Sequence, residues 1–503
     1  MTPYQWHDQN LAQATLDVGG AWHNLTSTLT ATRIITDTRK LQAGDIFLAL
    51  KGDNFDGHEF GKLAQEKGAV AVIGERALDC DLPQLLVTDS RLALGLLGKY
   101  RRDAHPDLTV IAITGSSGKT TTKEMLGSIF SQIAPTLITR GNLNNDLGVP
   151  MMLLELSDEH KFAVMELGAN HVGEIAYTAS LVRPDVACVL NIGTAHLGEF
   201  GGQENIARAK AEIYQGLTDS GVAVVPFGDK FADLLTQLAS QTTKRILTFG
   251  EKSVSLAEAG INLSEFSDDE RAELESLDSV LLMGDVFADD VDVANTHSTF
   301  TLSFNPSEDE LGSTTINLPF IGEHNVTNAL AAASCALALG VSLDVVCAGL
   351  ETAVAPKGRL TRIVFGEHLL IDDTYNANPT SMLVAADVLA NEVAEQKILV
   401  LGDIAELGDE AVSEHSKLGR DLADKVNAGS DISHVLTVGE LMSHCTKAIT
   451  GSDTALQSEH FADKGTLLLR LKELLATPSC VLFKGSRSAS METVITDLTQ
   501  NPT

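Results

Sequence analysis

One short stretch constrains the fold of this chain more than any other: "VIAITGSSGKTTTKEM", residues 110–125. Apolar residues lead into a loop of glycines and small hydroxyl residues, and a helix-forming segment follows. The backbone N–H groups of such a loop can turn inward around a phosphate, because glycine tolerates the required dihedral angles. The positive end of the following helix adds to the attraction. The stretch predicts a nucleotide-binding unit in which Lys119 faces the β- and γ-phosphates and Thr120 offers a hydroxyl to Mg²⁺.

This loop is shorter than the usual phosphate loop. The usual motif has four residues between its first glycine and the Gly-Lys-Ser/Thr group, which would require a glycine where this chain has Ile113. Here the loop starts at Gly115. A strand–helix turn that contains Gly-Lys-Thr by chance is the alternative, and the apolar strand before it and the helix after it argue against that alternative.

Apolar strands and helices alternate along most of the chain. Strands are predicted at "GDIFLALKG" and "GAVAVIG", then at "LTVIAITG", "KFAVMELG", "DVACVLNIG" and "GVAVVPFGD", and later at "HLLIDDTYNANP", "KILVLGDIAELG", "SHVLTVG" and "SCVLFKGS". Near-continuous apolar strands that alternate with helices indicate parallel sheets covered on both faces. The fold class is therefore α/β.

A length of 503 residues suggests three domains at about 150 residues each. "APKGRL", residues 355–360, contains Pro and Gly and is expected to be a linker and a hinge. We predict a small α/β domain (1–90), a central parallel-sheet domain that carries the phosphate loop (91–355), and a C-terminal Rossmann-like α/β domain (356–503).

The composition excludes several classes of protein. A formal net charge of −32 argues against non-specific binding to nucleic acid. The six cysteines form no C-x-x-C pair, so they predict reduced thiols in a cytoplasmic protein rather than a zinc site. The N-terminus lacks the basic and apolar regions of a secretion signal. The most apolar stretch, residues 329–341, is too short to span a bilayer and is expected to be a buried helix.

Residues 251–312 differ from the rest of the chain. They contain 16 acidic residues against Lys252 and Arg271, a net charge of −14. Such a composition is typical of a solvated surface insertion or a mobile loop. We assign it no chemistry and expect deletion of most of residues 255–310 to be less damaging than any mutation in the phosphate loop. Strand contributions from "VLLMGDVF" or "FTLSF" are the alternative.

Polar residues follow several predicted strands, at the edge where open α/β sheets bind their ligands. Glu166 ends one strand and could hold the Mg²⁺ that bridges the phosphates, but a helix cap or surface residue is equally consistent. His196 follows the next strand, and since Mg²⁺ prefers oxygen, these residues alone favour a hydrogen-bonded loop histidine. Lys210 lies in a probable helix, where a solvated lysine is the ordinary interpretation. Asn325 and Asn328 share a helix face and could read a purine edge, although capping explains one of them.

In the last domain, polar residues also gather after strands, and basic residues stand out in an acidic chain. Loop ends explain each of them singly, but their recurrence at strand ends favours a site. The residues are Asp373, Tyr375, Asn376 and Asn378, with the cations Arg359, Lys484 and Arg487.

The motifs "TGSSGKTTTKEM", "GNLNNDLGVP", "MELGAN", "GEHNVTNALAAA", "PKGRL", "DDTYNAN", "GDIAELG" and "KGSRSASME", in this order, resemble those of the Mur ligases. These enzymes are the ATP-dependent amide ligases of peptidoglycan precursor synthesis. "TDTRKLQAGDIFLALKGDNFDGHEF" is similar to the UDP-sugar-binding domain of the family. The resemblance covers nearly the whole chain and weakens across residues 251–312. "DDTYNAN" and "GNLNND" are most similar to the branch that joins D-alanyl-D-alanine to UDP-N-acetylmuramoyl-tripeptide.

The resemblance implies a reaction through an acyl phosphate, by a cytoplasmic monomer that inserts in no membrane. It implies that ATP contacts Gly115, Ser116, Ser117, Gly118, Lys119, Thr120, Thr121, Asn325, Asn328, Arg359 and Asp373. It implies that two Mg²⁺ ions and the catalysis depend on Lys119, Thr120, Glu166, His196 and Lys210, the last as a carbamate. It implies that the substrates contact Thr38, Arg39, Lys51, Asn142, Asn144, Asn145, Tyr375, Asn376, Asn378, Lys484 and Arg487.

Three other functions remain open at this stage. A folylpolyglutamate synthase-type ligase shares the loop and the chemistry, but it lacks a UDP-sugar domain. The Mur ligase that adds the third amino acid is disfavoured by "DDTYNAN". A nucleotide-gated binding protein would use the loop as a switch without making a bond, and the polar strand ends in two separate domains favour an enzyme over it.

Overall fold

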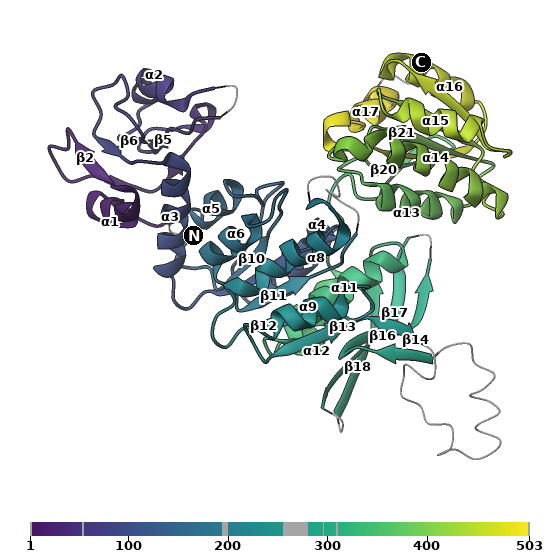
Figure 1. Cartoon of the computed structure of the whole chain (residues 1–503), viewed down its shortest axis with the longest axis horizontal. Helices are drawn as coiled ribbons and strands as arrows, with labels where there is room; N and C mark the ends of the chain where they lie inside the picture. The colour runs from purple at the N-terminus through teal and green to yellow at the C-terminus, as the bar shows by residue number, and fades with distance from the viewer. Residues whose placement is uncertain are drawn as a thin grey trace.

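The computed structural model describes residues 3–52, 55–193, 200–254, 280–294, 296–307 and 310–500. Three main sheets follow one another along the chain, and the first and last of them flank the larger central sheet (Figure 1). No helix of the described ranges is long and apolar enough to cross a membrane. The predicted α/β class is confirmed.

The first sheet has five strands in the order β2-β7-β6-β5-β4. Its strands are β2 (Ala21–His23), β4 (Ile34–Ile35), β5 (Ile46–Leu48), β6 (Ala71–Gly74) and β7 (Gln84–Leu86). The β2 strand runs antiparallel to β7, and the other neighbours are parallel. Its helices are α1 (Asp8–Ala14), α2 (Gly61–Glu66) and α3 (Ser90–Asp103). Two further short strands of the N-terminal part, β1 (Trp6–His7) and β3 (Thr30–Ala31), pair antiparallel with each other and form a separate two-stranded sheet.

The central sheet has nine strands in the order β18-β17-β16-β13-β12-β11-β8-β10-β9. They are β8 (Thr109–Thr114), β9 (Thr136–Ile138), β10 (Phe162–Glu166), β11 (Val186–Val189), β12 (Val222–Pro226), β13 (Ile246–Phe249), β16 (Val286–Val293), β17 (Ser298–Ser307) and β18 (Glu310–Leu318). From β9 to β16 all neighbours are parallel, so the carboxyl ends of these strands meet at one edge. The phosphate loop lies at this edge because it follows β8.

Helices cover both faces of the central sheet. One face packs against α4 (Lys119–Ser131), α11 (Glu323–Leu337) and α12 (Leu343–Glu351). The other packs against α5 (Gly148–Leu153), α6 (Glu174–Val182), α9 (Ala232–Ala239) and the end of α8 (Gln203–Ala211). Alternate residues of β8 supply the two cores: Ile111 and Ile113 belong to the first, Val110 and Ala112 to the second. Alternation of side chains along a strand produces this division.

The expectation of a solvated acidic insertion is wrong for residues 286–307. The β16 and β17 strands extend the central sheet, and β18 follows them as its antiparallel edge. Val286, Phe300 and Leu302 are at most 1% exposed and belong to the main core. Residues 251–254 and 280–283 form a separate hairpin, β14 (Glu251–Val254) with β15 (Val280–Met283). Residues 255–279, on which the rest of the expectation falls, lie outside the described residues.

The third sheet has six strands in the order β19-β20-β24-β21-β22-β23. They are β19 (Thr361–Phe365), β20 (His368–Asp373), β21 (Gln396–Gly402), β22 (His434–Val438), β23 (Gln457–Phe461) and β24 (Ser479–Lys484). Only the pairing of β19 with β20 is antiparallel. Its helices are α13 (Pro379–Ala390), α14 (Ala411–Asn427), α15 (Met442–Thr450), α16 (Lys464–Leu474) and α17 (Glu492–Gln500). This arrangement agrees with the predicted Rossmann-like fold.

The end of α3 ties the N-terminal part to the central part. The guanidinium of Arg101 is buried, lies over the ring of Tyr4 at 4.3 Å and donates to the carbonyl of Leu156 at 2.9 Å and to Asp158 at 2.8 Å. The Arg102 guanidinium donates to the carbonyl of Val182 at 3.0 Å. Planar guanidinium groups hold several acceptors at fixed angles, so these contacts fix the position of α3 against the central sheet.

Candidate active site

The phosphate loop, Gly115 to Gly118, joins β8 to α4. Gly118 has φ = +79°, which L side chains rarely adopt. An added Cβ there would also meet the Asn328 amide oxygen at 2.1 Å. The ammonium of Lys119 donates to the carbonyl of Gly115 at 2.7 Å. The loop therefore needs glycine at position 118 and keeps the lysine folded over its own backbone.

The end of the neighbouring strand β11 anchors this loop. The Asn191 side-chain oxygen accepts from the backbone N–H of Ser117 at 3.0 Å, and its backbone carbonyl accepts from the N–H of Ser116 at 3.1 Å. The Ser116 hydroxyl accepts in turn from the N–H of Gly193 at 2.8 Å. The loop is therefore held in place by its own strand and by the next one in the sheet.

A carboxylate and a hydroxyl meet beside the loop. Glu166, the last residue of β10, is buried and accepts a hydrogen bond from the Thr120 hydroxyl at 3.2 Å and from the Asn144 amide at 2.7 Å. Carboxylate and hydroxyl oxygens are hard donors that suit Mg²⁺. In the described part of the chain, no cluster of three His, Cys, Asp or Glu side chains could complete a metal site.

A half-buried lysine, Lys119, and a buried lysine, Lys210, lie next to Thr120 and Glu166. Lys119 and Lys210 both line the larger cavity, and Lys210 is only 4% exposed. Burial lowers the pKa of the Lys119 ammonium, and the carboxylate of Glu166 partly opposes that shift. Burial lowers the pKa of Lys210 strongly, and the charge of Lys119 adds to the effect. The described residues give the Lys210 ammonium no ion-pair or hydrogen-bond partner. It is therefore not the solvated helix lysine that its sequence context suggests.

The helix that carries Lys210 is tied to the loop that follows β10. The buried carboxylate of Glu212 accepts from the backbone N–H of Gly173 at 2.8 Å and from that of Ala176 at 3.1 Å. These N–H groups belong to the first turn of α6, whose positive end suits a carboxylate. Glu212, which directly follows α8, thus holds the end of that helix against the start of α6.

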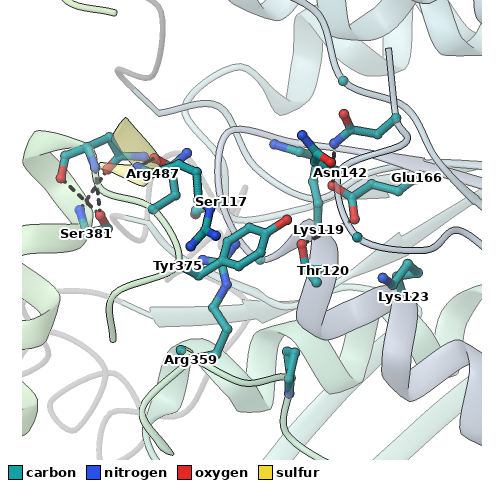
Figure 2. A pocket seen from close by; sticks show the side chains of 18 of the residues that line it. Ser117, Lys119, Thr120, Lys123, Asn142, Glu166, Arg359, Tyr375, Ser381 and Arg487 are labelled. Carbon is teal, nitrogen blue, oxygen red and sulfur yellow. Dashed lines mark hydrogen bonds between the residues drawn. The ribbon is translucent and has the colours of Figure 1, made fainter. Parts of the chain in front are cut away.

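The larger cavity has a volume of about 900 Å³ and lies between the central and C-terminal sheets (Figure 2). Most of the predicted site residues line it: Ser116, Ser117, Gly118, Lys119, Thr120, Asn142, Asn144, Asn145, Glu166, Lys210, Arg359, Tyr375, Asn376, Asn378 and Arg487. On the C-terminal side the Arg359 guanidinium stacks over the Tyr375 ring at 4.5 Å, and the Tyr375 N–H donates to the Gly358 carbonyl at 3.1 Å. Residues distant in sequence therefore converge on one space.

A smaller cavity of about 220 Å³ adjoins the loop. The Asn328 amide donates to the Asn325 side-chain oxygen at 3.1 Å, which confirms that the two share a helix face. Lys484 and Asp373 form a buried ion pair on the opposite wall. The predicted residues that line this cavity are Ser117, Gly118, Thr121, Asn325, Asn328, Arg359, Asp373 and Lys484. An apolar wall with amide and charged groups at its margins is typical of a site for a flat heterocycle.

Five predicted residues are not among the residues that line these two cavities, and one of them, Gly115, is the first residue of the phosphate loop itself. Thr38 and Arg39 lie in the N-terminal part, in a short 3₁₀ helix where Arg39 pairs with Asp37 at 2.8 Å. Lys51 lies near them in sequence and forms an isolated bridge with Asp56. His196 lies outside the described residues.

The structure adds residues that the sequence did not reveal. Lys123, Glu406 and Ser381 line the larger cavity, and half-buried His324 lines the smaller one. Glu406 has φ = +65°, a conformation that non-glycine residues adopt chiefly where the surroundings enforce it. For Lys123 the available signal was its spacing of four residues from Lys119, which places both on one helix face.

Three models of one family match successive parts of the chain. The Mur ligase family catalytic domain matches residues 30–106, the Mur ligase middle domain residues 113–336, and the Mur ligase glutamate ligase domain residues 358–487. A phosphate loop, an adjacent acid and a cavity shared with a Rossmann-like sheet fit this result. The chain belongs to the Mur ligase family.

Within the family, several relatives and solved structures are similar to this chain over nearly its full length. The chain is 41% identical to the UDP-N-acetylmuramoyl-tripeptide–D-alanyl-D-alanine ligase of Escherichia coli K12, over 98% of this chain and 99% of the relative. It is similar to the crystal structure of MurF from Acinetobacter baumannii, with a TM-score of 0.85, 46% identity and full coverage of both chains. It is also similar to MurF ligase from Thermotoga maritima in complex with ADP, with a TM-score of 0.74 and 26% identity over 93% and 97% of the two chains.

Proposed function

We propose that this protein joins D-alanyl-D-alanine to UDP-N-acetylmuramoyl-tripeptide and converts ATP to ADP and phosphate. The observation that carries the proposal is the larger cavity, where the phosphate loop and Glu166 face cations of the C-terminal part. The full-length similarity to the E. coli ligase supports the choice of substrates.

The reaction requires two anions to meet. The tripeptide carboxylate attacks the γ-phosphorus of ATP, ADP leaves, and an acyl phosphate results. The amine of D-alanyl-D-alanine then attacks the acyl carbon, loses a proton and displaces phosphate, so that an amide forms. Lys119 supplies positive charge beside the γ-phosphate and offsets the repulsion, and positioning supplies much of the rest. A cavity enclosed by two domains also excludes the water that would hydrolyse the acyl phosphate.

ATP binding follows from the two cavities. The phosphates would lie on residues 115–121, and adenine would lie in the smaller cavity beside Asn325 and Asn328. Arg359 and Asp373 would contact the ribose and phosphate side. Thr120 and Glu166, whose oxygens fit the hard-donor preference of Mg²⁺, would hold a first ion, and Lys210 as a carbamate, with His196, a second. When bound, these ions neutralise phosphate charge.

The remaining parts of the proposal concern the substrate contacts, the domain boundaries, the location and the oligomeric state. UDP would contact Thr38, Arg39 and Lys51 in the N-terminal domain, and Asn142, Asn144, Asn145, Tyr375, Asn376, Asn378, Lys484 and Arg487 would contact the peptide substrates. The predicted boundaries near residues 90 and 355 fall between the three sheets, and α3 after the first boundary packs in the core of the N-terminal sheet. All six cysteines are free, which supports a cytoplasmic location. We expect a monomer.

A phosphate-release assay tests the function. The purified protein with Mg²⁺ and ATP should release phosphate only when UDP-N-acetylmuramoyl-tripeptide and D-alanyl-D-alanine are both present, and the pentapeptide product should appear in equal amount. A nucleotide-gated binding protein would release phosphate without forming a peptide. Turnover of UDP-N-acetylmuramoyl-dipeptide with a free amino acid, and none of the tripeptide with D-alanyl-D-alanine, would point to the preceding ligase.

The carbamate at Lys210 can be tested separately. Addition of the Lys210 amine to CO₂ with loss of a proton would place an anionic oxygen donor where the structure has a buried lysine without a partner among the described residues. Lys210→Ala should then lose most activity, and acetate should restore part of it, because it can replace a carboxylate ligand. Chloride at the same ionic strength should not restore activity, since it changes only the screening of charges.

A second readout does not depend on turnover. Wild-type protein incubated with ¹³C-bicarbonate should show a carbamate ¹³C resonance that Lys210→Ala lacks. Identical spectra would exclude the carbamate, and loss of activity without acetate rescue would mean that Lys210 contacts substrate as an amine.

A further inference from the structure

A second lysine of α4 has no role in the reaction as described so far. Lys123 follows Lys119 by four residues, so both side chains lie on the same face of the helix. Its side chain is only 2% exposed, and it lines the larger cavity beside Thr120 (Figure 2). Helical side chains lean toward the N-terminus of their helix, which carries the Lys123 side chain back over the turn of Thr120.

The ammonium of Lys123 has more N–H donors than it has partners among the described residues. It carries three N–H groups, and among the described residues the ion-pair partner is one carboxylate oxygen of Glu124, at 2.9 Å. Glu124 is its neighbour in sequence and is 35% exposed. A buried cation at a cavity wall with unused donors is suited to an anionic ligand inside that cavity.

The residues around Lys123 indicate which anion it would bind. Lys119 is folded over the phosphate loop and serves the phosphates of ATP. Lys123 lies one turn further along α4, on the side of the cavity that Asn142, Asn144 and Glu166 also line. Amide groups beside a lysine provide several N–H donors, which a carboxylate can accept. The position lies next to the phosphate loop, where a carboxylate must stand to reach the γ-phosphate.

We propose that Lys123 binds the carboxylate end of the tripeptide and holds it beside the γ-phosphate. This inference rests on the proposed function. Both lysines would then help to bring the two anions together: Lys119 would bind the phosphates of ATP, and Lys123 would bind the carboxylate of the tripeptide. Lys123 is therefore a specificity-determining residue for the acyl substrate.

Binding measurements separate this role from a structural one. Isothermal titration calorimetry with a saturating non-hydrolysable ATP analogue and Mg²⁺ should show that Lys123→Met binds UDP-N-acetylmuramoyl-tripeptide at least tenfold more weakly than wild type. Methionine keeps the apolar stem and removes the charge. The affinity for ADP should stay within about twofold in the same variant, and Lys123→Arg should recover part of the loss, because it restores a cation.

Two controls sharpen the result. Glu124→Gln breaks the ion pair but keeps the lysine, so it should retain tripeptide affinity within about threefold; a loss equal to that of Lys123→Met would show that only the pair matters. A tripeptide analogue whose third residue carries carboxamides should bind wild type and Lys123→Met alike. Unchanged tripeptide affinity in Lys123→Met, or an equal loss for ADP, would overturn the inference alone. Failure of wild type to bind the tripeptide nucleotide would overturn the proposed function and the inference with it.

Discussion

Lys119→Ala should abolish ligation while leaving the fold intact. The Lys119 ammonium is the positive charge of the phosphate loop, and loss of one such group from a preorganised site typically lowers kcat by about 10²–10³-fold, or about 2.7–4 kcal/mol. The measurement is phosphate release with both cosubstrates present. Burial lowers the pKa of this lysine, so its charge is less favourable in the folded protein than in the unfolded chain and does not stabilise the fold. Removing the lysine should therefore not lower the melting temperature.

Lys417→Ala is the matched control. Lys417 pairs with Asp421 on α14 and its side chain is 57% exposed, so both the rate and the melting temperature should be unchanged. A loss of tenfold or less in Lys119→Ala, about 1.4 kcal/mol, would contradict the assignment of the loop.

Phe300→Ala should destabilise the protein by about 3–5 kcal/mol. Phe300 is 1% exposed in β17 and packs in the main core with Leu302 and Val286. Truncation of a buried phenylalanine removes its burial and leaves a cavity that the surrounding residues fill only in part. The measurement is calorimetric unfolding, which reports the transition of the central part even if the other domains unfold separately.

Val291→Ala, on the adjacent strand β16, is the comparison. Val291 is 43% exposed, so its truncation should change stability by no more than about 0.5 kcal/mol. If both variants unfolded like wild type, residues 286–307 would be the dispensable surface segment that their charge suggests. Deletion of the two strands should prevent folding of the central domain altogether.

Most of the fold could be predicted because it depends on local patterns. The parallel strands β8, β10, β11 and β12 are short, continuous apolar runs, and each is followed by a turn that the sequence marks. The strands β16 and β17 were predicted only as the alternative, from "VLLMGDVF" and "FTLSF", because Asp289, Asp290 and Asp292 dominate the composition of their region. Asp290 and Asp292 are exposed and Asp289 is half-buried, whereas Val286, Phe300 and Leu302 face the core, and the net charge of a segment does not reveal that difference.

The site residues could be predicted where a requirement of the backbone, or a helical spacing, is visible in the sequence. Glycine at 115 and 118, and the pair Asn325 and Asn328, follow from spacing alone. Lys123 and Lys210 were not recognisable as buried, because a lysine in a helix is usually solvated and only the tertiary packing shows that another element covers it. The contact of Arg359 with Tyr375 depends on a loop meeting a strand end, which no local pattern encodes.

The cations that line the larger cavity belong to a chain with a formal net charge of −32. An anionic molecule in dilute solution therefore approaches a surface that repels it, and it is attracted only when it reaches the cavity mouth. At physiological ionic strength the Debye length is about 8 Å, so the repulsion from distant surface charges is largely screened. The attraction inside the cavity acts at contact distance and persists. Encounter with anionic substrates then depends on short-range capture rather than on long-range steering.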